Sequence, residues 1–125
     1  MTLKSIRLEL AREKSHPEGD SNHGYEFRAP LTADGHLDAK AWTAAKTLCV
    51  VRHFRPDADD EIGVLHRTKA GHWVFSYELG EEDDEPIFRF SSHKFVPGEY
   101  VSITEHDDVQ RPFKVMSVKE WHPSK

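Results

Sequence analysis

Three acidic segments contain the residues whose types and spacing most directly suggest chemistry. They are residues 57–61 (DADDE), 81–85 (EEDDE) and 105–108 (EHDD), with four, five and three acidic residues, so they hold twelve of the 22 Asp and Glu residues. Hard divalent cations prefer several carboxylate oxygens as ligands, so such segments can form a cation site. The candidate metal ligands are Asp57, Asp59, Asp60, Glu81 and Asp83.

The spacing of these segments predicts that they lie at one end of the domain. Each is separated from the next by two strand-like stretches with a tight turn between them. In an up-and-down sheet, alternate connections lie at the same end. Besides a cation site, an acidic end can serve solubility or attract a basic protein partner.

A hairpin around residues 68–71 (TKAG) provides a second group of candidates. The simplest register places His66 opposite Trp73, on the inward face that Phe75 and Tyr77 continue. A neutral imidazole there could contact a ligand or act as a base, or it could be a core residue with one satisfied hydrogen bond. The candidate ligand-binding residues of this hairpin are His66, Trp73, Phe75 and Tyr77.

Residues 95–103 (FVPGEYVSI) and 111–118 (RPFKVMSV) form a predicted hairpin near the end of the sequence. This hairpin resembles part of the flavin-binding barrel of the ferredoxin-reductase family. The resemblance implies a flavin site, in which Arg111 and Phe113 would take the places of the family's Arg and Tyr. Arg111 is therefore a further candidate ligand-binding residue.

A second resemblance concerns the chain as a whole. Residues 23–38 (HGYEFRAPLTADGHLD), 59–63 (DDEIG) and 95–103 resemble small single-domain proteins of unknown function from bacterial genomes. This resemblance implies a bacterial, cytoplasmic protein and carries no activity.

The elements that would position these residues are mostly short strands. Apolar and polar residues alternate in several stretches, and Asp38 is placed to cap a short helix near residues 38–46 in which Trp42 docks inward. The pattern predicts a single all-β domain over residues 1–125, a small antiparallel β-barrel or roll of about 7–8 strands. A two-sheet sandwich is the alternative. The predicted strands are 6–10, 25–29, 48–54, 62–67, 72–79, 87–91, 100–104 and 113–118.

Composition narrows the partners and the location. The net charge of −5 argues against nucleic-acid binding, which depends on clustered Lys and Arg. The first residues lack the apolar run of a signal peptide and no later stretch approaches a membrane span, so we expect a cytoplasmic protein that does not bind membranes. Its single cysteine, Cys49, lies in an apolar run and is predicted to be a buried, reduced thiol.

These observations favour a non-enzymatic binding or interaction domain with an acidic end. Its expected partner is a protein or a small molecule, and no cofactor is expected. Two alternatives stay open, namely a flavin- or small-molecule-binding enzyme and a module that binds a divalent metal ion.

Overall fold

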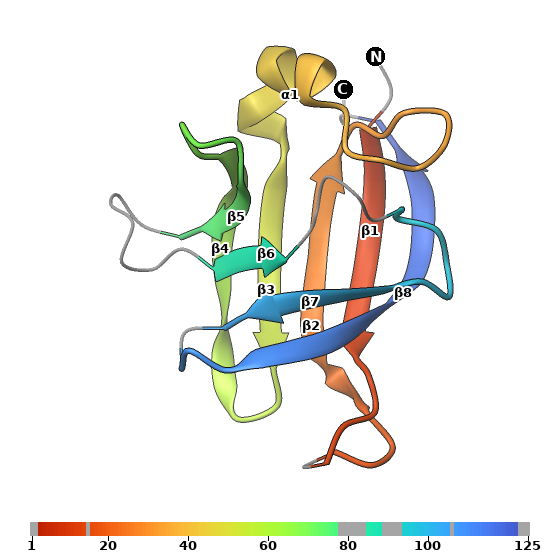
Figure 1. The fold of residues 1–125 in the computed structure, drawn as a ribbon, viewed down its shortest axis with the longest axis vertical. Coiled ribbons are helices and arrows are strands. Elements are labelled where there is room, and N and C mark those ends of the chain that lie inside the picture. Colours follow the sequence, from red (N-terminus) through yellow and green to blue (C-terminus); the bar gives the residue numbers. More distant parts are fainter. Residues whose placement is uncertain (1–2, 15, 78–84, 89–93, 106, 123–125) are drawn as a thin grey trace.

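The computed structural model describes residues 3–14, 16–77, 85–88, 94–105 and 107–122 of the protein. Its antiparallel strands follow one another in sequence order around a closed barrel, and β8 pairs back with β1 (Figure 1). The prediction of a mainly-β antiparallel barrel is therefore confirmed. The strands are β1 (Leu3–Leu10), β2 (Asp20–Ala29), β3 (Val50–Arg55), β4 (Ala58–Arg67), β5 (Trp73–Ser76), β6 (Glu85–Phe88), β7 (Tyr100–Thr104) and β8 (Gln110–Trp121).

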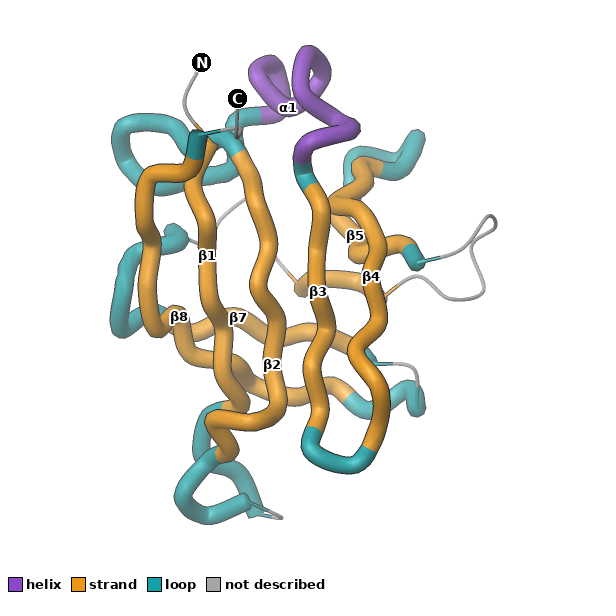
Figure 2. Tube along the Cα trace, turned by 180° about the vertical axis from the view of Figure 1, so that it is seen from behind, coloured by secondary structure: helices purple, strands orange, loops and turns teal. Residues whose placement is uncertain are grey.

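Strand pairing is unevenly distributed around the barrel. Strands β1, β2, β3 and β4 lie side by side in Figure 2, and β8 continues the sheet beyond β1 through a long ladder. On the other side, β6 joins each of its neighbours through two residue pairs. One extensive curled sheet thus forms most of the wall, and short strands close it.

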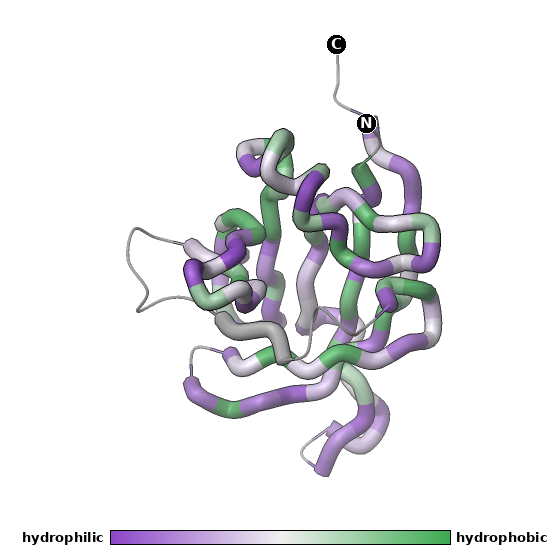
Figure 3. Tube along the Cα trace, turned by 45° about the horizontal axis from the view of Figure 1, so that its top comes forward, coloured by the Kyte–Doolittle hydropathy of each residue, from purple (hydrophilic) through white to green (hydrophobic). Residues whose placement is uncertain are grey.

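The core follows from the alternation of residues along the strands (Figure 3). Ile6 and Leu8 of β1 are fully buried, as are Tyr25 and Phe27 of β2. Tyr25 also stacks on Phe75 of β5, with ring centroids 5.0 Å apart. Side chains that point inward therefore fill the middle of the barrel, as expected for a small barrel.

Helix α1 (Ala39–Ala45), followed by the short 3-10 helix η1 (Lys46–Leu48), lies at one end of the barrel (Figure 1). The Asp38 carboxylate accepts a hydrogen bond from Ala41 N at 3.0 Å, which caps the helix. Trp42 is buried, and its Nε1 donates to Leu65 O at 3.0 Å. The predicted helix, its cap and the inward position of Trp42 are confirmed.

The predicted register of the β4–β5 hairpin is wrong by one residue. Arg67, not His66, lies opposite Trp73, and Leu65 pairs with Phe75. The cause is Gly71, whose φ of +87° gives the turn an additional left-handed residue, as in three-residue hairpin loops. Because side chains alternate between faces, this shift exposes His66 on the outer surface and buries Leu65.

Candidate metal centre

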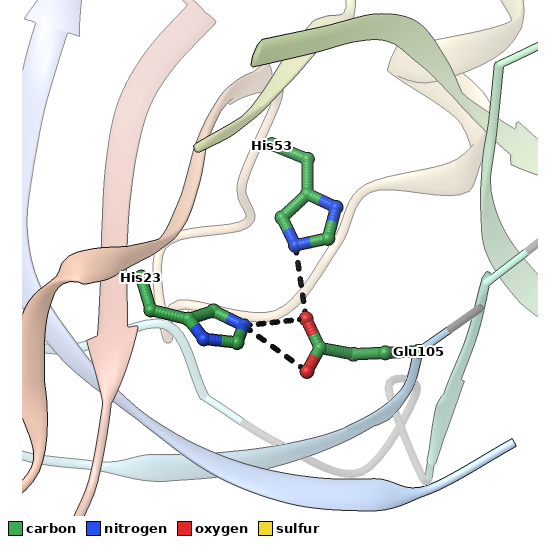
Figure 4. Close-up of side chains that lie close together, drawn as sticks. All are labelled: His23, His53 and Glu105. Atoms are coloured by element: carbon green, nitrogen blue, oxygen red, sulfur yellow. Dashed lines mark hydrogen bonds and ion pairs between the residues drawn. The ribbon is translucent and has the colours of Figure 1, made fainter. Parts of the chain in front are cut away.

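Three side chains with metal-binding chemistry converge at the end of the barrel opposite α1. They are His23 of β2, His53 of β3 and Glu105, which directly follows β7 (Figure 4). Glu105 Oε2 lies 2.8 Å from His23 Nε2 and 2.9 Å from His53 Nε2. One donor atom from each residue can be chosen so that all three lie within 4.8 Å of one another.

The strand pattern explains why these side chains meet. In β3, His53 follows the buried Val51 by two positions, so both point into the barrel. Glu105 continues the inward row of Val101 and Ile103 in the same way. Neighbouring strands of a closed barrel bring the last inward positions at one end into a single layer. In this barrel that layer is polar.

The Glu105 carboxylate is the centre of the network. Its Oε2 also accepts a hydrogen bond from the Tyr25 hydroxyl at 3.2 Å, and Arg111 Nη1 donates to its Oε1 at 2.9 Å. Burial alone raises the pKa of Glu105, but the hydrogen bonds from His23 and His53 outweigh burial and hold the pKa well below its ordinary value. The buried carboxylate is therefore anionic at neutral pH.

Arg111 holds the outer side of this carboxylate. Its Nη2 also donates to Asp107 Oδ2 at 2.9 Å. This hydrogen bond raises the pKa of Arg111 and lowers that of Asp107. Arg111 thus acts as a fixed cation that leaves Glu105 Oε2 directed at the two histidines.

Glu61 and Arg55 lie on the far side of His53, at ion-pair distances that do not have hydrogen-bond geometry. Glu61 lies directly opposite His53 in the β3–β4 register, and its Oε1 is 3.5 Å from His53 Nδ1. Arg55 Nη2 lies 3.2 Å from the same oxygen. Metal-binding histidines commonly direct their second ring nitrogen at a carboxylate, which orients the ring and makes it a better ligand.

These groups line a small pocket at the barrel end. Its volume is about 200 Å³. The side chain of His23 is 14% exposed, whereas that of His53 is 1% exposed, so the pocket meets solvent on the His23 side. Its lining residues are His23, His53, Arg55, Glu105, Asp107 and Arg111.

The spacing of the donor atoms is compatible with a metal ion. Two ligand atoms that each lie about 2.1 Å from a metal ion are about 3.0 Å apart at the right angle of octahedral coordination and about 3.4 Å apart at the tetrahedral angle of zinc. The separations from Glu105 Oε2 to the two imidazole nitrogens, 2.8 and 2.9 Å, are close to the octahedral value and would widen by about 0.5 Å around tetrahedral zinc. Two imidazoles and one carboxylate at neighbouring coordination positions form a donor set that divalent iron and zinc use in proteins.

The candidates from the aromatic hairpin do not join this site as a group. Trp73 and Phe75 are buried core residues, and Trp73 packs edge-on against Trp42 with ring centroids 5.3 Å apart. Tyr77 comes nearest the site, with its ring centroid 6.2 Å from that of His53. The inward position predicted for His66 is wrong, and of all the candidate ligand-binding residues only Arg111 lines the pocket.

The structure describes three of the five candidate acidic ligands. Asp57, Asp59 and Asp60 are exposed, and Asp60 accepts a hydrogen bond from Arg52 on the outer face of the sheet at 2.8 Å. None of these three belongs to the donor cluster found among the described residues. Glu81 and Asp83 lie outside the described residues, so a shared end for all three acidic segments stays a prediction.

Sequence reasoning missed the donors themselves. His23 lies outside the predicted strands, the nearest of which begins at residue 25, although β2 begins at Asp20. Glu105 was assigned to an acidic, solvated turn, yet it is buried. The available signal was positional, because each residue extends an alternating apolar row by one more inward position.

Comparison with protein-family models, with curated proteins and with solved structures finds no significant match to this chain. The two resemblances noted in the sequence, including the flavin-binding one, therefore stay predictions. Among the described residues, no helix combines the length and the apolar character needed to cross a membrane.

Proposed function

We propose that this barrel is a binding module for a divalent first-row transition metal ion. The ligands would be His23 Nε2, His53 Nε2 and the Glu105 carboxylate. The observation that carries the proposal is the approach of both imidazole Nε2 atoms to one buried carboxylate oxygen, at 2.8 and 2.9 Å.

The donor types favour a transition metal over calcium. Calcium takes six to eight oxygen ligands, whereas imidazole nitrogen suits zinc, iron, copper and nickel. The proposed site has one carboxylate and two imidazoles, and its outer oxygen is already held by Arg111. The acidic residues 57–61 contribute a supporting carboxylate, Glu61, in place of the ligands predicted from the sequence.

The surroundings also support the proposal. His53 has Glu61 at its second nitrogen, and Glu105 has Arg111 at its second oxygen. Such partners fix the orientation of a ligand before the metal arrives, which lowers the entropic cost of binding.

We further propose a cytoplasmic location in a bacterium. Cys49 is a free thiol buried in the core, as is usual for proteins of a reducing compartment. A non-enzymatic role in binding is the simplest function for such a site.

A competition titration with a chromogenic zinc chelator tests the metal site. The wild-type protein should withdraw one equivalent of zinc from the chelator. His23→Gln should weaken zinc binding by roughly 100-fold or more, because second-layer changes alone cost about 10–100-fold. His66→Gln is the matched control, since it makes the same change on the outer surface. Equal zinc affinities for both variants would refute the proposal and leave the cluster as a buried polar network.

A further inference from the structure

Arg55 also lines the pocket, and the proposed metal site gives it no role. It ends β3 and lines the pocket beside His53. Its Nη2 is occupied, since it donates to Asp59 O at 3.1 Å and lies 3.2 Å from Glu61 Oε1. Its Nε is a buried donor for which the described part of the chain supplies no acceptor. A buried donor of this kind is costly unless something accepts its hydrogen bond.

Arg111, the other cation of the pocket, is already neutralised. It donates to Glu105 at 2.9 Å and to Asp107 at 2.9 and 3.0 Å. Its Nε also has Glu13 Oε1 at 4.0 Å. The donor left for an incoming molecule is therefore on Arg55.

The charge balance of the pocket indicates what kind of molecule that is. The lining holds two cations, Arg55 and Arg111, and two anions, Glu105 and Asp107, so these charges cancel. A divalent ion bound by neutral imidazoles would add two positive charges to this lining, and the adjoining anions are Glu61 near Arg55 and Glu13 near Arg111. A pocket of about 200 Å³ with this charge favours a small anion.

Coordination chemistry supplies the second contact. A metal ion held by three protein ligands keeps at least one open position, which water or another ligand fills. A carboxylate or a similar oxyanion can place one oxygen on the metal and accept a hydrogen bond from a nearby guanidinium with another.

We infer that the metal-loaded pocket binds a small carboxylate or other oxyanion, with one oxygen on the metal ion and another on Arg55 Nε. This inference rests on the proposed metal site. It assigns Arg55 a direct ligand contact and gives the module a class of ligand, small oxygen anions.

The test uses the visible absorption of the cobalt(II)-loaded protein, with acetate as the anionic probe and acetamide as its neutral counterpart. Acetate should shift the cobalt band in a saturable way, and acetamide should not. Arg55→Gln should raise the half-saturating acetate concentration by about tenfold or more, the size expected for losing one hydrogen bond to a charged group. Arg52→Gln is the matched control, because Arg52 lies on the same strand but contacts Glu26 and Asp60 on the outer face. The Arg52→Gln protein should show the same half-saturating acetate concentration as the wild type.

The outcomes separate the two proposals. If cobalt does not bind at all, the proposed function fails. If cobalt binds but its band ignores acetate, or if Arg55→Gln responds to acetate like the wild type, the inference about the anion is wrong. Arg55→Lys retains the charge beside Glu61 but lacks Nε, so it should show the same loss even if Arg55→Gln loads cobalt poorly.

Discussion

His53 and Glu105 lie 52 positions apart in the sequence, and their side chains meet at 2.9 Å in the buried layer at one end of the barrel. Each is the last inward residue of its apolar row. The strand order around the closed barrel, and not local sequence, brings them together.

Replacing Glu105 with Gln should destabilise the metal-free protein. The change removes the anion that Arg111 and two histidines contact while keeping the shape of the side chain. We expect a loss of about 1.5–3 kcal/mol in the free energy of unfolding, the usual worth of a hydrogen bond to a charged group. Urea denaturation at pH 7 measures it, and Glu120→Gln at an exposed position should change the free energy by less than about 0.5 kcal/mol.

The same carboxylate predicts an acid dependence of stability. The pKa of Glu105 in the folded protein is below its ordinary value of 4.5, so the unfolded chain binds a proton first as the pH falls. The contribution of Glu105 is fully present above about pH 5 and is lost as the pH falls from there towards the folded pKa. Urea denaturation between pH 6 and 3 should show a shallower loss in Glu105→Gln than in the wild type. Parallel curves for the two proteins would contradict this assignment.

Much of the fold could be predicted from the sequence because alternation is a local signal. The alternating apolar residues Tyr25 and Phe27, and likewise Val101 and Ile103, are typical of half-buried strands. The helix capped by Asp38 could also be predicted from neighbouring residues alone. By contrast, the orientation of His66 depended on one left-handed glycine, Gly71, which changed the register of the hairpin.

The candidate metal site could not be predicted from local sequence patterns. His53 was recognised as a strand residue, but its partners come from β2 and from the turn after β7. Which strand ends meet depends on barrel closure and on the stagger between strands. The acidic segments drew attention to exposed carboxylates, whereas the carboxylate at the centre of the site, Glu105, is buried.

Replacing Glu61 should weaken metal binding without removing a ligand. Its Oε1 lies 3.5 Å from His53 Nδ1, so Glu61→Gln should reduce zinc affinity by about 10–100-fold through the orientation and basicity of His53. Asp60→Asn removes the same charge from the neighbouring position, where the side chain pairs with Arg52 outside the barrel. Calorimetric zinc titrations should separate the two variants, and equal affinities would mean that only overall charge matters.

Trp73 is expected to be a structural residue. It is 4% exposed and packs against Trp42, so Trp73→Ala should cost about 3–5 kcal/mol of stability. Tyr100→Ala is the comparison, because Tyr100 is 54% exposed and its loss should cost less than about 0.5 kcal/mol. Thermal and urea unfolding measure both. A loss below about 1 kcal/mol for Trp73→Ala would instead indicate a surface role.

Cys49 should be unreactive in the folded protein. It is fully buried, and burial raises the pKa of its thiol from 9.0 to about 11. A disulfide reagent at pH 8 should label it only after urea is added. Because the unfolded thiol ionises first, stability should also fall as the pH rises from about 9 to 11. Rapid labelling of the folded protein would contradict the burial of this thiol.

The most direct measurement is the imidazole ¹H–¹⁵N spectrum of the nine histidines during zinc titration. One equivalent of zinc should shift the Nε2 signals of His23 and His53 and leave the signals of the other seven histidines unchanged. His66 serves as the internal control because it lies on the outer face. Zinc-induced shifts at other histidines with none at His23 and His53, or no shift in any of them at one equivalent, would rule out a metal site at His23 and His53.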